Sequence, residues 1–330
     1  MRKLYNISQS ALVAALMALS AFACTRDEQP SEGSVVEIPE HRRQISELDS
    51  WIDATFLPYG IEVVYRWDKH AVAYGSYAYP PAVERVKPVL ELIKSLCLDL
   101  YDHKGAEGRP FLQTKTPLRI YLFGGKGVDR RGFELVAAPK DSALELYVYN
   151  VNAFEPSSDD AVYSLIHSVH HQLLRRLMEL YPYDRDAFRR LSDYREVGID
   201  LAIEGQAKAK TARERFGVSS FANGDGFLTI YGMLGSEADF ADMLAASLCN
   251  HPEEIRSALK RAAVPSITDD TPEVNEYYRQ KAKRAAEALQ AKLIFVESYY
   301  HKVVGRRLSE MQLRSLELIN NYKQRNYEPK

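Results

Sequence analysis

The stretch DAVYSLIHSVHHQLLRRLMEL, residues 160–180, carries the pattern that decides the fold. Its apolar residues recur every three or four positions, which predicts an amphipathic helix packed against a core. These positions are Val162, Leu165, Ile166, Val169, Leu173 and Leu177. His167 and His171 are four residues apart, so both imidazoles lie on one face of the helix. Two imidazoles that converge in this way are ligands that zinc prefers.

The residue after the first histidine departs from the usual zinc-hydrolase pattern. In an H-E-x-x-H motif, a glutamate at this position takes a proton from the metal-bound water. This chain has Ser168 there, and a serine hydroxyl is not a base near neutral pH. The motif predicts a zinc site with impaired hydrolysis; the alternative for any isolated H-x-x-x-H pair is that the histidines only fill the core.

Strands are expected mainly before residue 152 and helices after it. Apolar runs predict strands at residues 61–67, 118–123 and 143–151. Helical spacing predicts helices at residues 45–57, 83–101, 160–180, 186–214, 236–250, 252–261, 272–305 and 309–323. Ser236 and Ser309 are the expected N-caps of two of them. The pattern predicts an α+β fold, with a small mixed sheet followed by a mainly helical C-terminal half.

The glycine run Gly124-Gly125-Lys126-Gly127 follows the second predicted strand. A phosphate-binding loop would need Ser or Thr after the lysine and a helix that begins there. Gly127 follows the lysine instead, and the next residues are not helical in pattern. This run is therefore expected to be a loop of the sheet.

The composition excludes several classes of protein. The chain has 330 residues with 43 basic and 45 acidic side chains, a net charge of −2 that gives no electrostatic reason to bind nucleic acid. Three cysteines cannot form a disulfide framework or a cysteine-rich zinc module. Cys97 and Cys249 lie in predicted apolar helices, so we expect buried thiols rather than a zinc pair.

Residues 1–23 predict a lipoprotein signal peptide. Arg2 and Lys3 precede a mainly apolar run at 11–23, which as a helix would rise about 20 Å, short of the roughly 30 Å bilayer interior. Ala21-Phe22-Ala23-Cys24 resembles a bacterial lipobox, in which Cys24 is lipidated; the alternative is an ordinary signal peptide with an incidental cysteine. Residues 24–40 are acidic and contain Pro and Gly, which predicts a flexible tether. One domain then remains at residues 41–330.

Several segments, in order along the chain, resemble the substrate-import-associated zinc metallohydrolase lipoproteins, a zinc-binding metallopeptidase family known from Bacteroidetes. Besides Cys24, the matching segments are LDSWIDATFLPYGIEVVYRWD (48–68), YVYNVNAF (147–154), HSVHHQLL (167–174), GFLTIYGMLGSEADFADMLAASL (226–248) and AKLIFVESYYHKVVGRRLSEMQL (291–313). The resemblance implies a zincin-like metallopeptidase domain. It also implies zinc as the cofactor, bound weakly or not at all in this chain.

The resemblance assigns site residues one by one. His167 and His171 match the two helical metal ligands, and Ser168 takes the place of the catalytic glutamate. In the family's E-D-F-A-E motif, Ala238 takes the first glutamate position, and the acidic residues are Asp239 and Asp242. We therefore expect Asp239 or Asp242 as a metal ligand and Tyr231 as a stabiliser of an oxyanion. The alternatives are a solvated acidic helix start for the aspartates and a packing role for the tyrosine.

The genes of this family usually lie beside those of a TonB-dependent outer-membrane importer and its surface lipoprotein partner. The resemblance therefore implies a lipid-anchored outer-membrane protein of a nutrient import system. The departures at Ser168 and Ala238 predict little or no peptidase activity. Asp27 and Glu28 are similar to acidic export signals and favour the cell surface over a periplasm-facing position.

Two other functions stay open. One is a non-enzymatic accessory lipoprotein that binds peptide or glycan through tyrosine pairs. The candidate pairs are Tyr277-Tyr278 and Tyr299-Tyr300. The other is an active hydrolase whose general base lies on the helix predicted over residues 186–214. The candidate bases are Glu196, Asp200 and Glu204.

Overall fold

The computed structural model describes residues 46–67, 78–102, 111–112, 115–137, 144–194, 197–267 and 271–327. The chain divides into two units, Met1–Ser46 and Glu47–Lys330, and the fold described is that of the second. The predicted signal peptide, the tether and Cys24 lie outside the described residues. None of the helices in these ranges combines the length and the apolar composition of a membrane-spanning segment.

Three short strands form a parallel sheet in the order β1-β2-β3. They are β1 (Glu62–Val64), β2 (Arg119–Leu122) and β3 (Glu145–Val148). Ile120 in β2 pairs with Val63 on one side and with Leu146 on the other. A mixed sheet was expected, but the described strands are all parallel. Antiparallel bridges such as Val128 with Glu134 are isolated and lie outside these strands.

Helices make up most of the other described residues, and the longer ones agree closely with the predicted ranges. They are α2 (Glu47–Phe56), α3 (Val83–Leu92), α4 (Asp159–Leu180), α9 (Ser236–Cys249), α10 (Pro252–Ala262), α11 (Pro272–Val304) and α12 (Leu308–Tyr327). The helix that begins as α3 continues through a π-helical turn, Ile93–Leu98, and a 3-10 turn, Asp99–Tyr101. Both predicted serine N-caps are wrong, because Ser236 is the first residue of α9 and Ser309 lies inside α12.

The single helix predicted over residues 186–214 is also wrong. The structure has three separate helices there, α5 (Arg185–Arg189), α6 (Ile199–Lys208) and α7 (Ala212–Phe216), and a short α8 (Ser220–Asn223) follows. Gly198, before α6, has φ 158° and ψ −165°, a conformation that residues with a Cβ rarely adopt. Thr211 then caps α7 by accepting a hydrogen bond from the Glu214 N–H at 3.1 Å.

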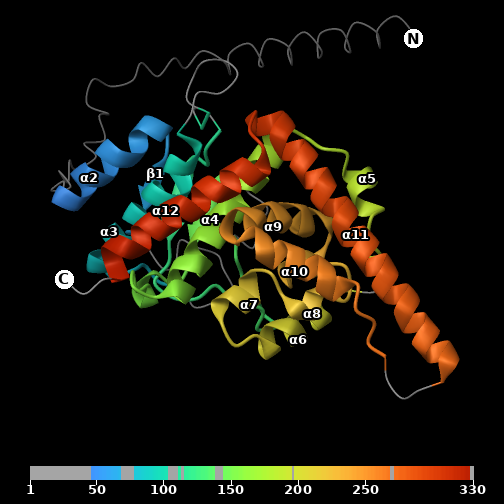
Figure 1. The fold of residues 1–330 in the computed structure, drawn as a ribbon. Helices are drawn as coiled ribbons and strands as arrows, with labels where there is room; N and C mark the ends of the chain where they lie inside the picture. The colour runs from blue at the N-terminus through green and yellow to red at the C-terminus, as the bar shows by residue number, and fades with distance from the viewer. Residues whose placement is uncertain are drawn as a thin grey trace, which may run out of the picture. The chain divides into compact units, whose positions relative to one another are not determined.

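The helix α4 occupies the centre of the domain. Ser158 caps its first turn by accepting a hydrogen bond from the Ala161 N–H. One side of α4 packs against β3 and another against α9, while α11 and α12 contact α9 in turn. Figure 1 shows this arrangement, with the N-terminal part of α11 extending beyond the neighbouring helices. The histidines of α4 are therefore placed between several packed elements.

Gln172 connects α4 to the sheet by hydrogen bonds. Its Oε1 accepts a hydrogen bond from the Tyr147 N–H at 2.8 Å, and its Nε2 donates to the Tyr147 carbonyl at 2.8 Å and to the Val136 carbonyl at 3.2 Å. Tyr147 belongs to β3, and Val136 belongs to the loop that follows the glycine run. Both segments are thus fixed against the part of α4 that carries His171 and Ser168.

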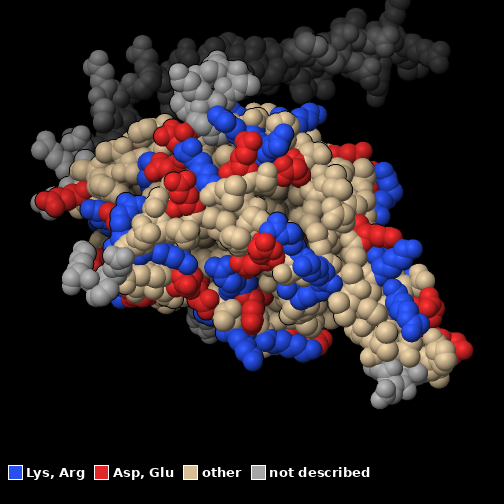
Figure 2. Space-filling model, viewed as in Figure 1, with Lys and Arg blue, Asp and Glu red and all other residues tan. Residues whose placement is uncertain are grey.

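Charge is distributed evenly over the face drawn in Figure 2, where Lys and Arg side chains alternate with Asp and Glu side chains, also along α11. Cys97 and Cys249 are both buried and free, as expected. Burial raises the pKa of each thiol, so both stay protonated near neutral pH.

Candidate functional site

The histidines of α4 all point into the protein. His167, His170 and His171 are each fully buried. The His167 ring stacks on Tyr163, with 5.9 Å between ring centroids, and the His170 ring lies at the edge of Tyr101 at 6.2 Å. The histidines are therefore packed among apolar and aromatic side chains and are inaccessible to solvent.

Asp242 of α9 joins the two histidines that were expected to share a face. His167 Nε2 lies 2.8 Å and His171 Nδ1 lies 3.0 Å from the same oxygen, Asp242 Oδ1. The Thr229 hydroxyl donates to the other oxygen, Oδ2, and itself accepts from the Gly232 N–H at 3.1 Å. We call His167, His171, Thr229 and Asp242 the His–Asp cluster.

The protonation states within the cluster follow from its burial and contacts. Burial alone would raise the pKa of Asp242, but the interaction with His167 and the hydrogen bonds from both histidines hold this pKa well below its usual range. Asp242 is therefore an ionised carboxylate, which only accepts hydrogen bonds, so the ring nitrogens that face it carry the hydrogens.

The other ring nitrogens are left without partners. Burial lowers the pKa of His171, although its contact with Asp242 opposes this, and burial lowers the pKa of His170 to about 3. Both rings are therefore neutral at pH 7. In the described parts of the chain, His167 Nδ1, His171 Nε2 and both nitrogens of His170 have no hydrogen-bond partner.

As arranged, these residues do not fit a zinc ion. Zinc binds the lone pair of an imidazole nitrogen, and a catalytic site keeps a fourth position open for water. In the cluster, the nitrogens nearest the carboxylate direct hydrogens towards it, and His167, His171 and Asp242 are fully buried. Across the ranges that the structure describes, no group of three or more His, Cys, Asp or Glu side chains is arranged to hold a metal ion.

Asp239, the other candidate ligand, lies apart from the cluster. Its Oδ2 accepts hydrogen bonds from Lys292 Nζ at 2.8 Å and from the Tyr194 hydroxyl at 2.7 Å. Burial raises the pKa of Asp239 and lowers that of Lys292, while the attraction between them opposes both shifts. Lys292 Nζ also lies 4.0 Å from the centroid of the Phe227 ring. Asp239 therefore serves as the partner of a buried lysine.

Sequence reasoning missed Lys292 entirely. The residue is fully buried in α11, within the apolar run AKLIFV at residues 291–296. A lone lysine in such a run is the available signal, because a buried ammonium group needs an acidic partner.

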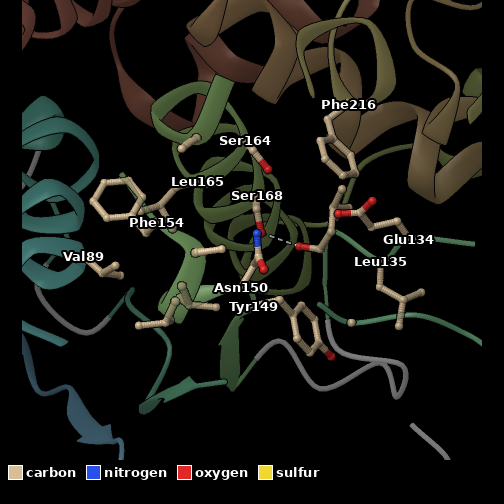
Figure 3. A pocket seen from close by; sticks show the side chains of 16 residues that line it. Val89, Glu134, Leu135, Tyr149, Asn150, Phe154, Ser164, Leu165, Ser168 and Phe216 are labelled. Carbon is tan, nitrogen blue, oxygen red and sulfur yellow. Dashed lines mark hydrogen bonds between the residues drawn. The ribbon is translucent and has the colours of Figure 1, made fainter. Parts of the chain in front are cut away.

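Ser168 faces a different part of the molecule from the cluster. Its hydroxyl donates to the Val136 carbonyl at 2.6 Å, beside a pocket of about 70 Å³ (Figure 3). Gln206 fixes the same loop, since it accepts from the Glu134 N–H at 2.9 Å and donates to the Glu134 carbonyl at 3.0 Å. The position expected for a catalytic glutamate is therefore occupied by a hydroxyl that is bonded to the main chain.

Tyr231 lies beside the cluster. It begins the 3-10 helix η5 (Tyr231–Leu234), and its ring contacts the His171 ring edge-to-face at 5.2 Å between centroids. The alternative bases lie elsewhere: Asp200 and Glu204 are exposed on α6, and Glu204 pairs with Lys208 at 2.6 Å. Glu196 lies outside the described residues.

The histidine helix beside a small sheet, facing an acidic helix, defines a metallopeptidase-like protein. The family model described as "Putative zinc-binding metallo-peptidase" matches residues 41–305, and the chain belongs to this family. Its fold is also similar to the crystal structure, at 2.10 Å resolution, of a protein from Bacteroides caccae ATCC 43185 with the same description. That match has a TM-score of 0.58 and 16% identity, and it covers 86% of this chain and 95% of the other. No curated protein matches the chain.

Proposed function

We propose that this chain is a metallopeptidase-like protein that no longer hydrolyses peptides. The His–Asp cluster carries this proposal, because His167 and His171 are buried and each uses one ring nitrogen to hold the carboxylate of the third expected ligand, Asp242. Ser168 supports it, since its hydroxyl is bonded to the Val136 carbonyl and is not a base. Loss of a general base alone slows a reaction by roughly 10²–10⁴-fold.

Zinc content and peptide cleavage, measured on the same purified protein, test this proposal. We expect clearly less than one zinc ion per chain by elemental analysis and no cleavage of a mixed peptide library above background. Stoichiometric zinc together with cleavage that His167→Ala abolishes would overturn the proposal.

A Ser168→Glu variant distinguishes loss of the general base alone from loss of the metal site as well. If the general base were the only missing part, glutamate would restore cleavage. Because the cluster already engages the candidate ligands, we expect this variant to stay inactive, like the matched Ser168→Ala control. A large gain of cleavage in Ser168→Glu alone would show that the cluster opens to bind metal.

We further propose that Cys24 anchors the protein by lipid to the outer membrane at the cell surface, next to a TonB-dependent importer and its lipoprotein partner. The lipobox and the acidic residues Asp27 and Glu28 support the anchor and its surface position, and the family resemblance supports the partners. Cys24→Ser should release the protein from the membrane fraction. Protease added to intact cells should digest the wild-type protein; full protection would favour a periplasm-facing position. Failure of the importer pair to co-purify would contradict the partnership.

Binding of a peptide or glycan is a second candidate function, favoured by two pockets along α11. One, of about 860 Å³, is lined by charged side chains such as Arg189 and Glu287, and the other, of about 730 Å³, is lined mainly by apolar and aromatic ones. Leu191 and Ala291 line both pockets, so the two pockets are neighbours. Tyr299 lines the second pocket. Phe295 also lines the second pocket. Reduced binding of a peptide or glycan library by Phe295→Ala, with the fold intact, would support this function.

A further inference from the structure

The pocket beside Ser168 contains polar side chains that are not used by the fold. Asn150 and Ser164 both line it (Figure 3), and neither side chain has a hydrogen-bond partner in the described part of the chain. The pocket volume is about 70 Å³. A single water needs about 10–15 Å³ of cavity volume, so this pocket suits a group of about five non-hydrogen atoms.

The backbone holds Asn150 in place. Its φ is 62°, the one positive φ of a non-glycine residue among those described, and its N–H donates to the Gly125 carbonyl at 2.7 Å. Asparagine tolerates this left-handed conformation better than most residues. Nearby, a Cβ on Gly127 would come within 2.6 Å of the Tyr149 ring, so this wall of the pocket is tightly packed. The Asn150 amide is therefore presented to the pocket by a fixed loop.

The carboxylate beside the pocket already has basic partners. Glu134 is the charged residue among its lining side chains, and its carboxylate pairs with Arg215 at 2.8 Å and with Lys126 at 3.3 Å. The remaining wall is mainly apolar, with Val148 and Leu165 among its side chains. A ligand that fits these surroundings is uncharged, has both a donor and an acceptor, and carries a small apolar end.

We propose that this pocket binds a neutral amide group, such as the acetamido group of an amino sugar or an amide of a peptide. The ligand carbonyl and N–H pair with the Asn150 amide and the Ser164 hydroxyl, and the adjoining methyl or methylene contacts the apolar wall. This inference rests on the proposed non-hydrolytic function, since a bound amide is then retained intact.

Acetamide and acetate are matched probes of this pocket, because they have the same shape and differ in charge. In an NMR titration of the purified protein, we expect acetamide to give saturable shifts at the backbone amides of residues 134–136 and 149–151. Acetate should bind at least about fivefold more weakly, consistent with the loss of a hydrogen bond next to a carboxylate. N-acetylglucosamine and an acetylated dipeptide amide, compared in the same way, distinguish the two sources of the amide.

Two small substitutions test the assigned contacts. Asn150→Asp keeps a residue that tolerates the left-handed backbone, and Ser164→Ala removes one hydroxyl; each should weaken acetamide binding about fivefold. Equal binding of acetate and acetamide, no saturable shift at these residues, or unchanged binding in both variants would overturn the inference. Peptide cleavage by a protein that still binds acetamide would overturn the proposed function and leave the amide pocket standing.

Discussion

Asp239 and Asp242, one turn apart on α9, are both fully buried and bind different neighbouring helices. Asp239 pairs with Lys292 of α11, and Asp242 accepts hydrogen bonds from His167 and His171 of α4. The first turns of α9 are thus joined by carboxylates to a helix on either side. An acidic motif that the resemblance assigns to metal binding therefore joins helices in this chain.

Replacing Asp242 should destabilise the protein strongly. Asp242→Asn keeps the shape but removes a charge that accepts three hydrogen bonds, so we expect the free energy of unfolding to fall by about 2–4 kcal/mol. Urea denaturation measures this change. Asp53→Asn makes the same chemical change at an exposed position of α2 and should stay within about 0.5 kcal/mol of the wild type. Equal effects in both variants would contradict a structural role for the cluster.

Metal removal should leave the stability of the protein unchanged. A metal at one hundred times its dissociation constant stabilises a fold by about 2.7 kcal/mol, which would raise the melting temperature by about 4 °C in a domain of this size. We expect neither a chelator nor added zinc to shift the melting temperature by more than about 1 °C. Magnesium is the control for non-specific ion effects. A rise in melting temperature with zinc but not with magnesium would show that the protein binds zinc in its folded state.

Lys292 and Asp239 should be strongly coupled. Removing one partner of a buried ion pair leaves an uncompensated charge and costs about 3–5 kcal/mol, so Lys292→Met alone should be severely destabilised. The double variant Lys292→Met/Asp239→Asn buries no charge at either position and should lose clearly less than the sum of the two single variants. Additive losses in a double-mutant cycle, measured by denaturation, would show that the pair is not coupled.

Gly127 should not tolerate a side chain. A Cβ at this position would lie 2.6–2.7 Å from atoms of the Tyr149 ring, and overpacking of this kind costs about 1–3 kcal/mol. Gly224→Ala is the matched control, because Gly224 has an ordinary helical φ of −63° and no atom within 4 Å of its Cβ position. Gly127→Ala should therefore lower the melting temperature more than Gly224→Ala does. Equal melting temperatures of the two variants would contradict this prediction.

The sequence predicted the elements whose pattern is local. The apolar stripe from Val162 to Leu177 placed α4 to within one residue of its observed start, and the four-residue spacing placed His167 and His171 on one face. The family resemblance named Asp242 as a candidate metal ligand, and the structure places its carboxylate within hydrogen-bond distance of both histidines.

Features that depend on distant partners could not be predicted. Lys292 meets Asp239 across 53 positions of sequence, and Ser168 meets Val136 across 32, so neither contact leaves a periodic signal. The predicted helix is interrupted between Arg189, where α5 ends, and Ile199, where α6 begins after Gly198. The parallel direction of the strands depends on how the chain crosses over between them, which apolar patterning does not encode.

Gln172 lies against the outer edge of β3, one of the two outer strands of the described sheet. Edge strands present unpaired main-chain groups on which another extended chain can be added as a further strand. Gln172 already occupies both the N–H and the carbonyl of Tyr147, in the part of β3 that such a chain would need. One glutamine side chain thereby opposes the addition of an extended chain to the sheet along β3.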